Sequence, residues 1–288
     1  MNVARVTEVD PSAQRGAQPT TAANGPKLVR RLDELTWPLF IRIFGGFQLL
    51  QYGEPVNVRV RGKSEALLQI LALESGAYGA RDVLLDRLWP DSSHDLACQS
   101  LNSLVYFLNK LLRDALGGAP PVINEEGGYR LNREMGVATD IGLFDEWART
   151  GDQHAIAGDD SQAIEYYSCA VNLYRGDLQG QDDVDTVLRR EHLRAKYLTL
   201  LARLAQYHFM GQEYEESLDY ALRLLHTEPC REDAHRMVMA CYVRRGERAQ
   251  ALRQYRLCET ILCNEFGAKP EPATTELFEQ TRDDPASV

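Results

Sequence analysis

The sequence has no run of apolar residues long enough to cross a membrane, and a polar segment follows its first methionine. A membrane-spanning helix needs roughly 20 consecutive apolar residues, and a secretory signal peptide needs an apolar core near the N-terminus. The chain has neither feature. We therefore expect a cytoplasmic protein with no membrane partner.

Motifs for catalysis and cofactor binding are also missing. The sequence contains no glycine-rich phosphate-binding loop, no G-x-S-x-G motif and no H-E-x-x-H motif. Its six cysteines are scattered singly, with no C-x-x-C pair, which favours free thiols over a zinc site or a disulfide framework. We expect no enzymatic activity, no cofactor and no bound metal.

Residues 81–131 carry the most informative pattern in the chain. A short helix is predicted at 81–89, where Pro90 stops it because proline cannot supply the next helical N–H. A polar turn follows, and then a long amphipathic helix continues to Leu116. Its predicted buried face consists of Leu101, Leu104, Leu108, Leu111 and Ala115. Two short extended segments around Gly127-Gly128 then predict a hairpin.

Polar and basic side chains occupy the opposite face of the long helix and the hairpin. Such groups hydrogen-bond to base edges and phosphates: asparagine or glutamine pairs with adenine, and arginine or lysine with guanine or phosphate. The candidate DNA-binding residues are Gln99, Asn102, Ser103, Tyr106, Asn109, Lys110, Arg113, Tyr129 and Arg130. The pattern predicts a winged helix that binds DNA, although any amphipathic helix also has a polar face.

The remaining sequence divides around this unit. Residues 1–38 have almost no apolar periodicity and are expected to be a disordered tail. Alternating apolar and polar residues at 39–60 predict a small antiparallel sheet, and residues 64–77 predict a helix. Every pattern after residue 143 is helical, and most of the net charge of −10 lies there. We expect an α+β DNA-binding domain at 39–143 and an all-α domain at 144–288.

The helical half contains an internal repeat. A tyrosine follows nine positions after a glycine three times, in the pairs Gly158 and Tyr167, Gly211 and Tyr220, and Gly246 and Tyr255. The last two glycines are spaced close to the roughly 34-residue period of tetratricopeptide (TPR) repeats. Small residues, Ala163 and Ala251, lie five positions after two of these glycines, whereas Glu216 occupies that position in the middle copy. The pattern predicts stacked helical hairpins, with an irregular helical bundle as the alternative.

These two halves together resemble the Streptomyces antibiotic regulatory protein (SARP) family, which joins an OmpR-type winged helix to a TPR-like bacterial transcriptional activator domain. The resemblance runs from about 39 to 282. The segments that carry it are 41–47, 86–91, 101–116 and 127–131 in the first half, and 163–178, 228–235 and 251–270 in the second.

The resemblance implies a sequence-specific transcriptional activator that binds promoter repeats in double-stranded DNA and contacts RNA polymerase. The turn before the recognition helix is the implied polymerase contact, with Asp91, Ser92, Ser93 and His94 as candidates. The helical domain is expected to hold a second copy of the chain or a regulatory protein. A fragment ending near residue 143 is then expected to retain some DNA contact.

The chain also departs from the family pattern. Many members have two consecutive basic residues near the end of the recognition helix, where this chain has Lys110 and Arg113 separated by two leucines. Val105 stands where a polar reader is common. Members often continue into an ATPase or a phosphothreonine-reading domain, neither of which is expected here. The alternative hypothesis is an interaction protein with a degenerate winged helix, which regulates another protein through its TPR-like domain.

Overall fold

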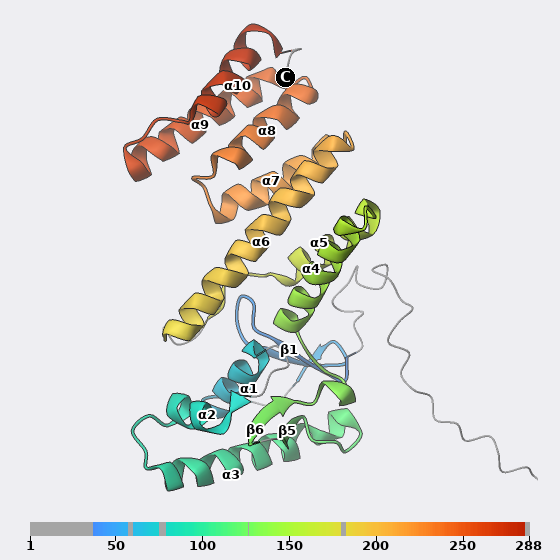
Figure 1. Cartoon of the computed structure of the whole chain (residues 1–288), viewed down its shortest axis with the longest axis vertical. Coiled ribbons are helices and arrows are strands. Elements are labelled where there is room, and N and C mark those ends of the chain that lie inside the picture. The colour runs from blue at the N-terminus through green and yellow to red at the C-terminus, as the bar shows by residue number, and fades with distance from the viewer. Residues whose placement is uncertain (1–36, 57–59, 75–78, 126, 180–182, 286–288) are drawn as a thin grey trace, which may run out of the picture.

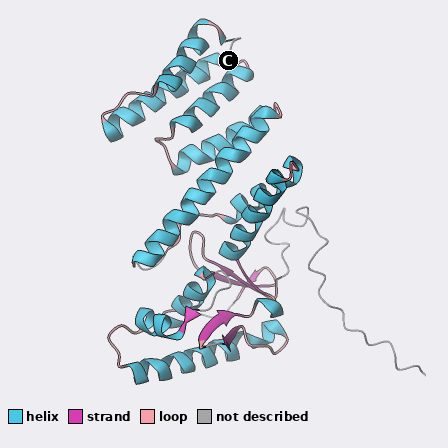
Figure 2. Cartoon of the chain, viewed as in Figure 1, coloured by secondary structure: helices cyan, strands magenta, loops and turns pink. Residues whose placement is uncertain are grey.

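The computed structural model describes residues 37–56, 60–74, 79–125, 127–179 and 183–285. These residues form an elongated molecule, with all the described strands at one end and a stack of helices extending away from them (Figures 1 and 2). A small strand-containing region followed by a helical domain is the order that the sequence predicted. The expected N-terminal tail lies outside the described residues, except for Trp37 and Pro38. No described helix is both long and apolar enough to cross a membrane.

The first sheet has the strand order β3-β2-β1-β7. Strand β1 (Leu39–Arg42) pairs antiparallel with β2 (Gln48–Gln51), which in turn pairs with β3 (Glu54–Pro55). This antiparallel part confirms the prediction for the segment, although residues 57–59 lie outside the described chain. Strand β7 (Val137–Thr139) pairs in parallel with β1 and was not predicted.

Three helices and a second sheet follow. The helices are α1 (Lys63–Leu73), α2 (Arg81–Leu88) and α3 (His94–Leu112). The second sheet has the order β4-β6-β5, formed by β4 (Gly79–Ala80), β5 (Val122–Glu125) and β6 (Gly128–Leu131). The antiparallel pairing of β5 with β6 confirms the predicted hairpin. The long helix ends at Leu112, earlier than predicted, and a 3-10 helix covers Arg113–Leu116.

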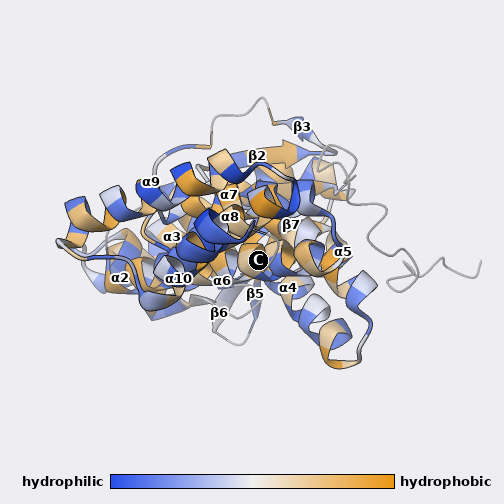
Figure 3. Cartoon of the chain, turned by 90° about the horizontal axis from the view of Figure 1, so that it is seen from above, coloured by the Kyte–Doolittle hydropathy of each residue, from blue (hydrophilic) through white to orange (hydrophobic). Residues whose placement is uncertain are grey.

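The rest of the chain forms helical hairpins, and their helices carry both hydrophobic and hydrophilic residues (Figure 3). The pairs are α4 (Asp140–Ile156) with α5 (Asp160–Leu173), α6 (Val184–Met210) with α7 (Tyr214–Thr227), and α8 (Glu232–Arg244) with α9 (Arg248–Phe266). Helix α10 (Pro272–Asp283) packs on the last pair. Each hairpin turn contains one residue in the left-handed conformation, namely Gly158, Gln212 and Gly246.

These left-handed residues correct the predicted alignment of the repeat. Five positions after them lie the small, buried residues Ala163, Ser217 and Ala251, and nine positions after them lie Tyr167, Ala221 and Tyr255. In the middle copy the left-handed residue is therefore Gln212 and not the preceding glycine. The alignment of Tyr220 with Tyr167 and Tyr255 was wrong by one residue. Tyr220 is only half-buried, and Glu216 is exposed.

The corrected alignment predicts unequal effects of tyrosine substitutions. Tyr255 is 8% exposed and stacks on Phe278, with 4.1 Å between the ring centroids. Tyr255→Ala is expected to lower the free energy of unfolding by about 3–5 kcal/mol, since a buried aromatic ring is lost. Tyr220→Ala is expected to cost about 1–2 kcal/mol. Denaturant unfolding measures both, with Tyr106→Ala as an exposed control. Equal losses at Tyr220 and Tyr255 would contradict the alignment.

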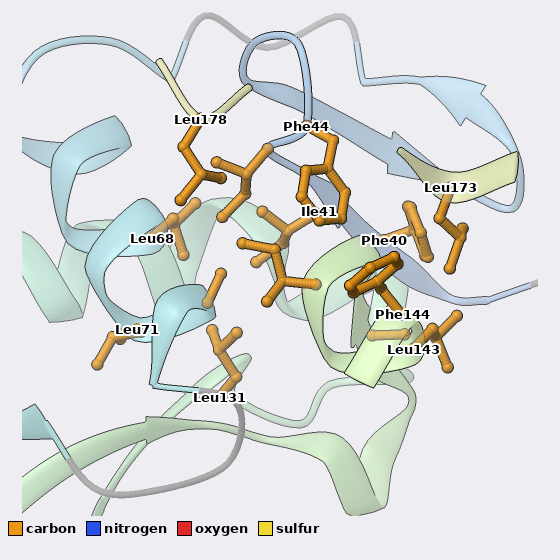
Figure 4. Packing of buried hydrophobic residues seen from close by; sticks show 14 of the residues in the cluster. Phe40, Ile41, Phe44, Leu68, Leu71, Leu131, Leu143, Phe144, Leu173 and Leu178 are labelled. Carbon is orange, nitrogen blue, oxygen red and sulfur yellow. The ribbon is translucent and has the colours of Figure 1, made fainter. Parts of the chain in front are cut away.

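The predicted boundary between residues 143 and 144 lies inside α4. Figure 4 shows Phe44 and Phe144 in one cluster with Leu178, a residue that precedes α6. Phe44 meets Phe144 edge-on with 5.4 Å between the ring centroids, and Tyr174 at 4.7 Å. One hydrophobic core therefore continues from the sheets into the helical half.

Candidate nucleic-acid interface

Helix α3 lies across the end of the molecule that is farthest from α10 (Figure 1). Its buried face consists of Ala97, Leu101, Val105, Leu108 and Leu112. Two residues of the predicted face, Leu104 and Leu111, are only half-buried. The buried line is thus rotated slightly from the predicted one. Val105, which stands where a polar reader is common, packs inward.

The outward face of α3 contains most of the candidates on that helix. Gln99, Asn102, Ser103, Tyr106 and Lys110 are all exposed. The sequence-based selection missed two apolar residues on this face, Leu96 and Phe107, which are 61% and 46% exposed. A helical projection of the sequence could have identified them, because both lie opposite the buried line.

Asn102 joins three elements. Its Oδ1 accepts hydrogen bonds from Arg81 Nη2 of α2 at 3.2 Å and from the Tyr129 hydroxyl of β6 at 3.1 Å. Since a guanidinium has no acceptor, the amide oxygen must face Arg81, and the amide nitrogen faces outward. Asn102 therefore presents N–H donors. The paired donor and acceptor that recognise adenine are not both available in this arrangement. Tyr129 is buried, so it supports Asn102 and is not a surface contact.

Asn109 also has a structural role. Its Nδ2 donates to the Val122 carbonyl and its Oδ1 accepts from the Val122 N–H, both at 3.0 Å. This paired contact fixes the hairpin to α3. The hairpin backbone thus holds the amide in one orientation, which disfavours the predicted base contact of Asn109.

The basic candidates differ in their surroundings. Arg130 forms ion pairs with Glu125 at 3.0 Å and Glu134 at 2.9 Å, and its hydrogen bonds lower the pKa of the Glu134 carboxyl. Its charge is thus neutralised locally, which disfavours the predicted DNA contact. Arg113 donates to the Gly118 carbonyl at 3.2 Å. Lys110 is exposed and forms no ion pair within the described part of the chain, and it lines a shallow hollow with Arg113 and Tyr106.

The predicted polymerase contacts form the exposed turn between α2 and α3 together with the first residue of α3. Asp91, Ser92, Ser93 and His94 are all exposed there. On the other side of α2, Arg87 pairs with Asp183 at 2.9 Å and Asp185 at 3.2 Å, next to the start of α6. Helix α2 is therefore attached to the helical half, while the turn after it faces solvent.

The described residues contain no cluster of three or more histidine, cysteine, aspartate or glutamate side chains that could hold a metal ion, and their cysteines are free thiols.

Comparison with known proteins identifies a family and several similar proteins. Residues 139–282, half of the chain, match the bacterial transcriptional activator domain. The transcriptional regulatory protein MoaR1 of Mycobacterium bovis is 23% identical over 235 residues, covering 78% of this chain and 76% of MoaR1. The transcriptional regulatory protein EmbR of Mycobacterium tuberculosis is 27% identical over 253 residues, covering 83% of this chain but only 62% of EmbR.

A solved structure extends the likeness to three dimensions. The structure of Mycobacterium tuberculosis EmbR in complex with a low-affinity phosphopeptide superposes with a TM-score of 0.63 and 24% identity. The match covers 85% of this chain and 65% of that one. This similarity shows that the two chains share a fold.

Proposed function

The chain belongs to the SARP-type transcriptional regulators that carry the bacterial transcriptional activator domain, and we infer from this that it binds specific promoter DNA. We assign residues 39–139 as an OmpR-type winged helix with α3 as the recognition helix and the β5–β6 hairpin as the wing. The helices from α4 onward are a TPR-like domain in this proposal. The separation between Gln212 and Gly246 equals the roughly 34-residue TPR period.

The observation that best supports DNA binding is the exposed face of α3 beside a hairpin that Asn109 fixes to it. A major groove accepts one α-helix, and a rigidly attached hairpin can then reach the neighbouring backbone. Asn102 and Lys110 lie on this face, with Arg113 at its end. We propose that they, with Gln99, Ser103 and Tyr106, form the DNA contact.

The charges of this face predict how binding depends on salt. Lys110 and Arg113 are the exposed cations of this face. Arg130 in the neighbouring hairpin adds little positive charge, because it is paired with carboxylates. Each phosphate neutralised by the protein releases counterions, so two cations give a shallow salt dependence and weak binding for one copy. We propose that promoter repeats bind two copies, joined through the helical half.

Substitutions on α3 should separate sequence reading from phosphate contact. Asn102→Ala is expected to reduce the binding free-energy difference between the preferred base pair and the others by about 1–3 kcal/mol at one or two positions. The reason is that it removes a donor to a base edge. Lys110→Ala is expected to weaken binding to all sequences alike, as loss of a phosphate contact does. Titrations of a selected operator and a scrambled duplex measure both effects.

Lys269→Ala is the matched control, since this exposed lysine lies in the helical half. It should bind both duplexes as the wild type does. If Asn102→Ala and Lys110→Ala also bind both duplexes unchanged, α3 does not enter the groove.

The family and the exposed turn at Asp91–His94 together support a second element of the proposal, contact with RNA polymerase.

The alternative, an interaction protein with a degenerate winged helix, is favoured by the few exposed cations on α3. Elution from a DNA column separates these functions. A DNA-binding regulator elutes progressively earlier as salt increases, whereas an interaction protein is not retained at low salt.

A further inference from the structure

An apolar line runs along the outward face of α3. Leu96, Ser100, Ser103 and Phe107 follow one another at intervals of four, three and four residues, which places them on one side of the helix. Leu96 is 61% exposed and Phe107 is 46% exposed. We call these four residues the apolar stripe. At 1.5 Å per residue the stripe is about 16 Å long.

The two serines make this stripe less polar than the sequence suggests. Ser100 Oγ donates to the Leu96 carbonyl at 2.8 Å, and Ser103 Oγ donates to the Gln99 carbonyl at 2.9 Å. Each hydroxyl proton is therefore used within the helix, and what these serines still offer is a methylene group and acceptor lone pairs. The stripe has no N–H donor with which to read a base edge.

We propose that the apolar stripe contacts the 5-methyl groups of thymines in the major groove, so that the protein selects operators by thymine position. This inference rests on the proposed DNA binding. The thymine methyl is the apolar group that base pairs present in the major groove. Leucine and phenylalanine set against polar base edges would bury donors and acceptors without partners, which is unfavourable. Thymines opposite Leu96 and Phe107 avoid that cost.

The length of the apolar stripe also predicts how far apart the contacted thymines lie along the operator. Base pairs are separated by about 3.4 Å along the duplex, so 16 Å spans on the order of four to five pairs. Leu96 and Phe107 therefore contact thymines near opposite ends of one half-site. Lys110, three residues beyond Phe107, lies on the same face.

Replacing thymine by deoxyuracil tests the proposal, because uracil keeps the base-pair hydrogen bonds and lacks only the methyl group. An operator is first selected from random duplexes by the full chain and then synthesised with uracil at every thymine. The wild type is expected to bind the uracil duplex five- to thirtyfold more weakly. Phe107→Ala and Leu96→Ala should bind the thymine duplex more weakly and lose most of the discrimination between thymine and uracil.

Leu257→Ala is the matched control, since Leu257 is half exposed but lies on α9. It should discriminate between thymine and uracil as the wild type does. Equal binding of both duplexes by the wild type overturns the apolar-stripe proposal and leaves DNA binding intact. An undiminished uracil penalty in both stripe variants also overturns it. If no duplex is selected, the proposed function fails as well, and a changed oligomeric state of Phe107→Ala would then assign the stripe to protein contact.

Discussion

Asp140→Ala is expected to lower the free energy of unfolding by about 2–5 kcal/mol. Asp140 is 1% exposed, and its carboxylate accepts the N–H groups of Ile43 at 2.7 Å and of Phe44 and Ile141 at 2.8 Å. The substitution leaves buried N–H groups unpaired at the end of β1 and releases the start of α4. Denaturant unfolding followed by circular dichroism measures the loss.

Asp140→Asn separates the hydrogen bonds from the charge. Ile43 and Phe44 both donate to one carboxylate oxygen, and a neutral amide can keep that acceptor. We therefore expect Asp140→Asn to lose less stability than Asp140→Ala. Losses of equal size would show that the backbone contacts contribute little.

The pH dependence of stability provides a second test of Asp140. Burial raises the pKa of its carboxyl to about 6, from an ordinary value of 3.8. Because the folded-state pKa is raised, this group stabilises the fold at low pH, and that contribution is lost as pH rises through about 6. Relative to Asp140→Asn, the wild type should gain roughly 1 kcal/mol between pH 8 and pH 5. Parallel pH profiles would contradict this assignment.

Local sequence patterns were sufficient to predict strands that pair with their neighbours in the sequence. The hairpin at 122–131 and the antiparallel β1–β2 pair both have glycine turns between short alternating segments, and both are present. Strand β7 has only three residues, and its partner β1 lies almost a hundred positions away. No local period marks such a strand, because tertiary packing determines its pairing.

The repeat shows a different limit. The repeat was aligned on three glycines, and glycine is the residue that adopts a left-handed conformation without steric cost. In the turn between α6 and α7, Gly211 has φ −75° and Gln212 has φ 61°. The spacing after the turn therefore shifted by one residue. A non-glycine residue in the left-handed region is uncommon, and composition could not indicate it.

The candidate interface was predictable as a face but not as a set of contacts. Helical periodicity correctly placed Gln99, Tyr106 and Lys110 on the exposed side of α3. It could not show that Asn109 binds the backbone of β5, or that Arg130 lies between two glutamates. These partners lie in β5 and in the 3-10 helix Arg133–Met135, and a pattern along α3 contains no information about groups outside that helix.

A fragment ending at residue 143 is expected not to fold, contrary to the expectation from sequence. The cut removes most of α4 and with it Phe144, which is fully buried against Phe44. It also removes Leu178, whose backbone forms a bridge with Phe44, and Gln179, whose side chain donates to the Gly45 carbonyl at 3.2 Å. Limited proteolysis should digest this fragment rapidly while the full chain resists. A protease-resistant fragment would show that the first domain is independent.

Phe144→Ala in the full chain tests the same contact without removing any helix. The substitution is expected to lower the free energy of unfolding by about 3–5 kcal/mol, and Phe266→Ala is the exposed control, with little expected change. The same contacts also affect function. They join the loop after β1, which contains Phe44, to the segment after α5, which contains Tyr174 and Leu178. A chain whose two halves share one core cannot move them as independent domains without exposing these aromatic rings. Changes that a partner makes in the helical half are therefore expected to reach α3 through this core and through the Arg87 ion pairs on α2.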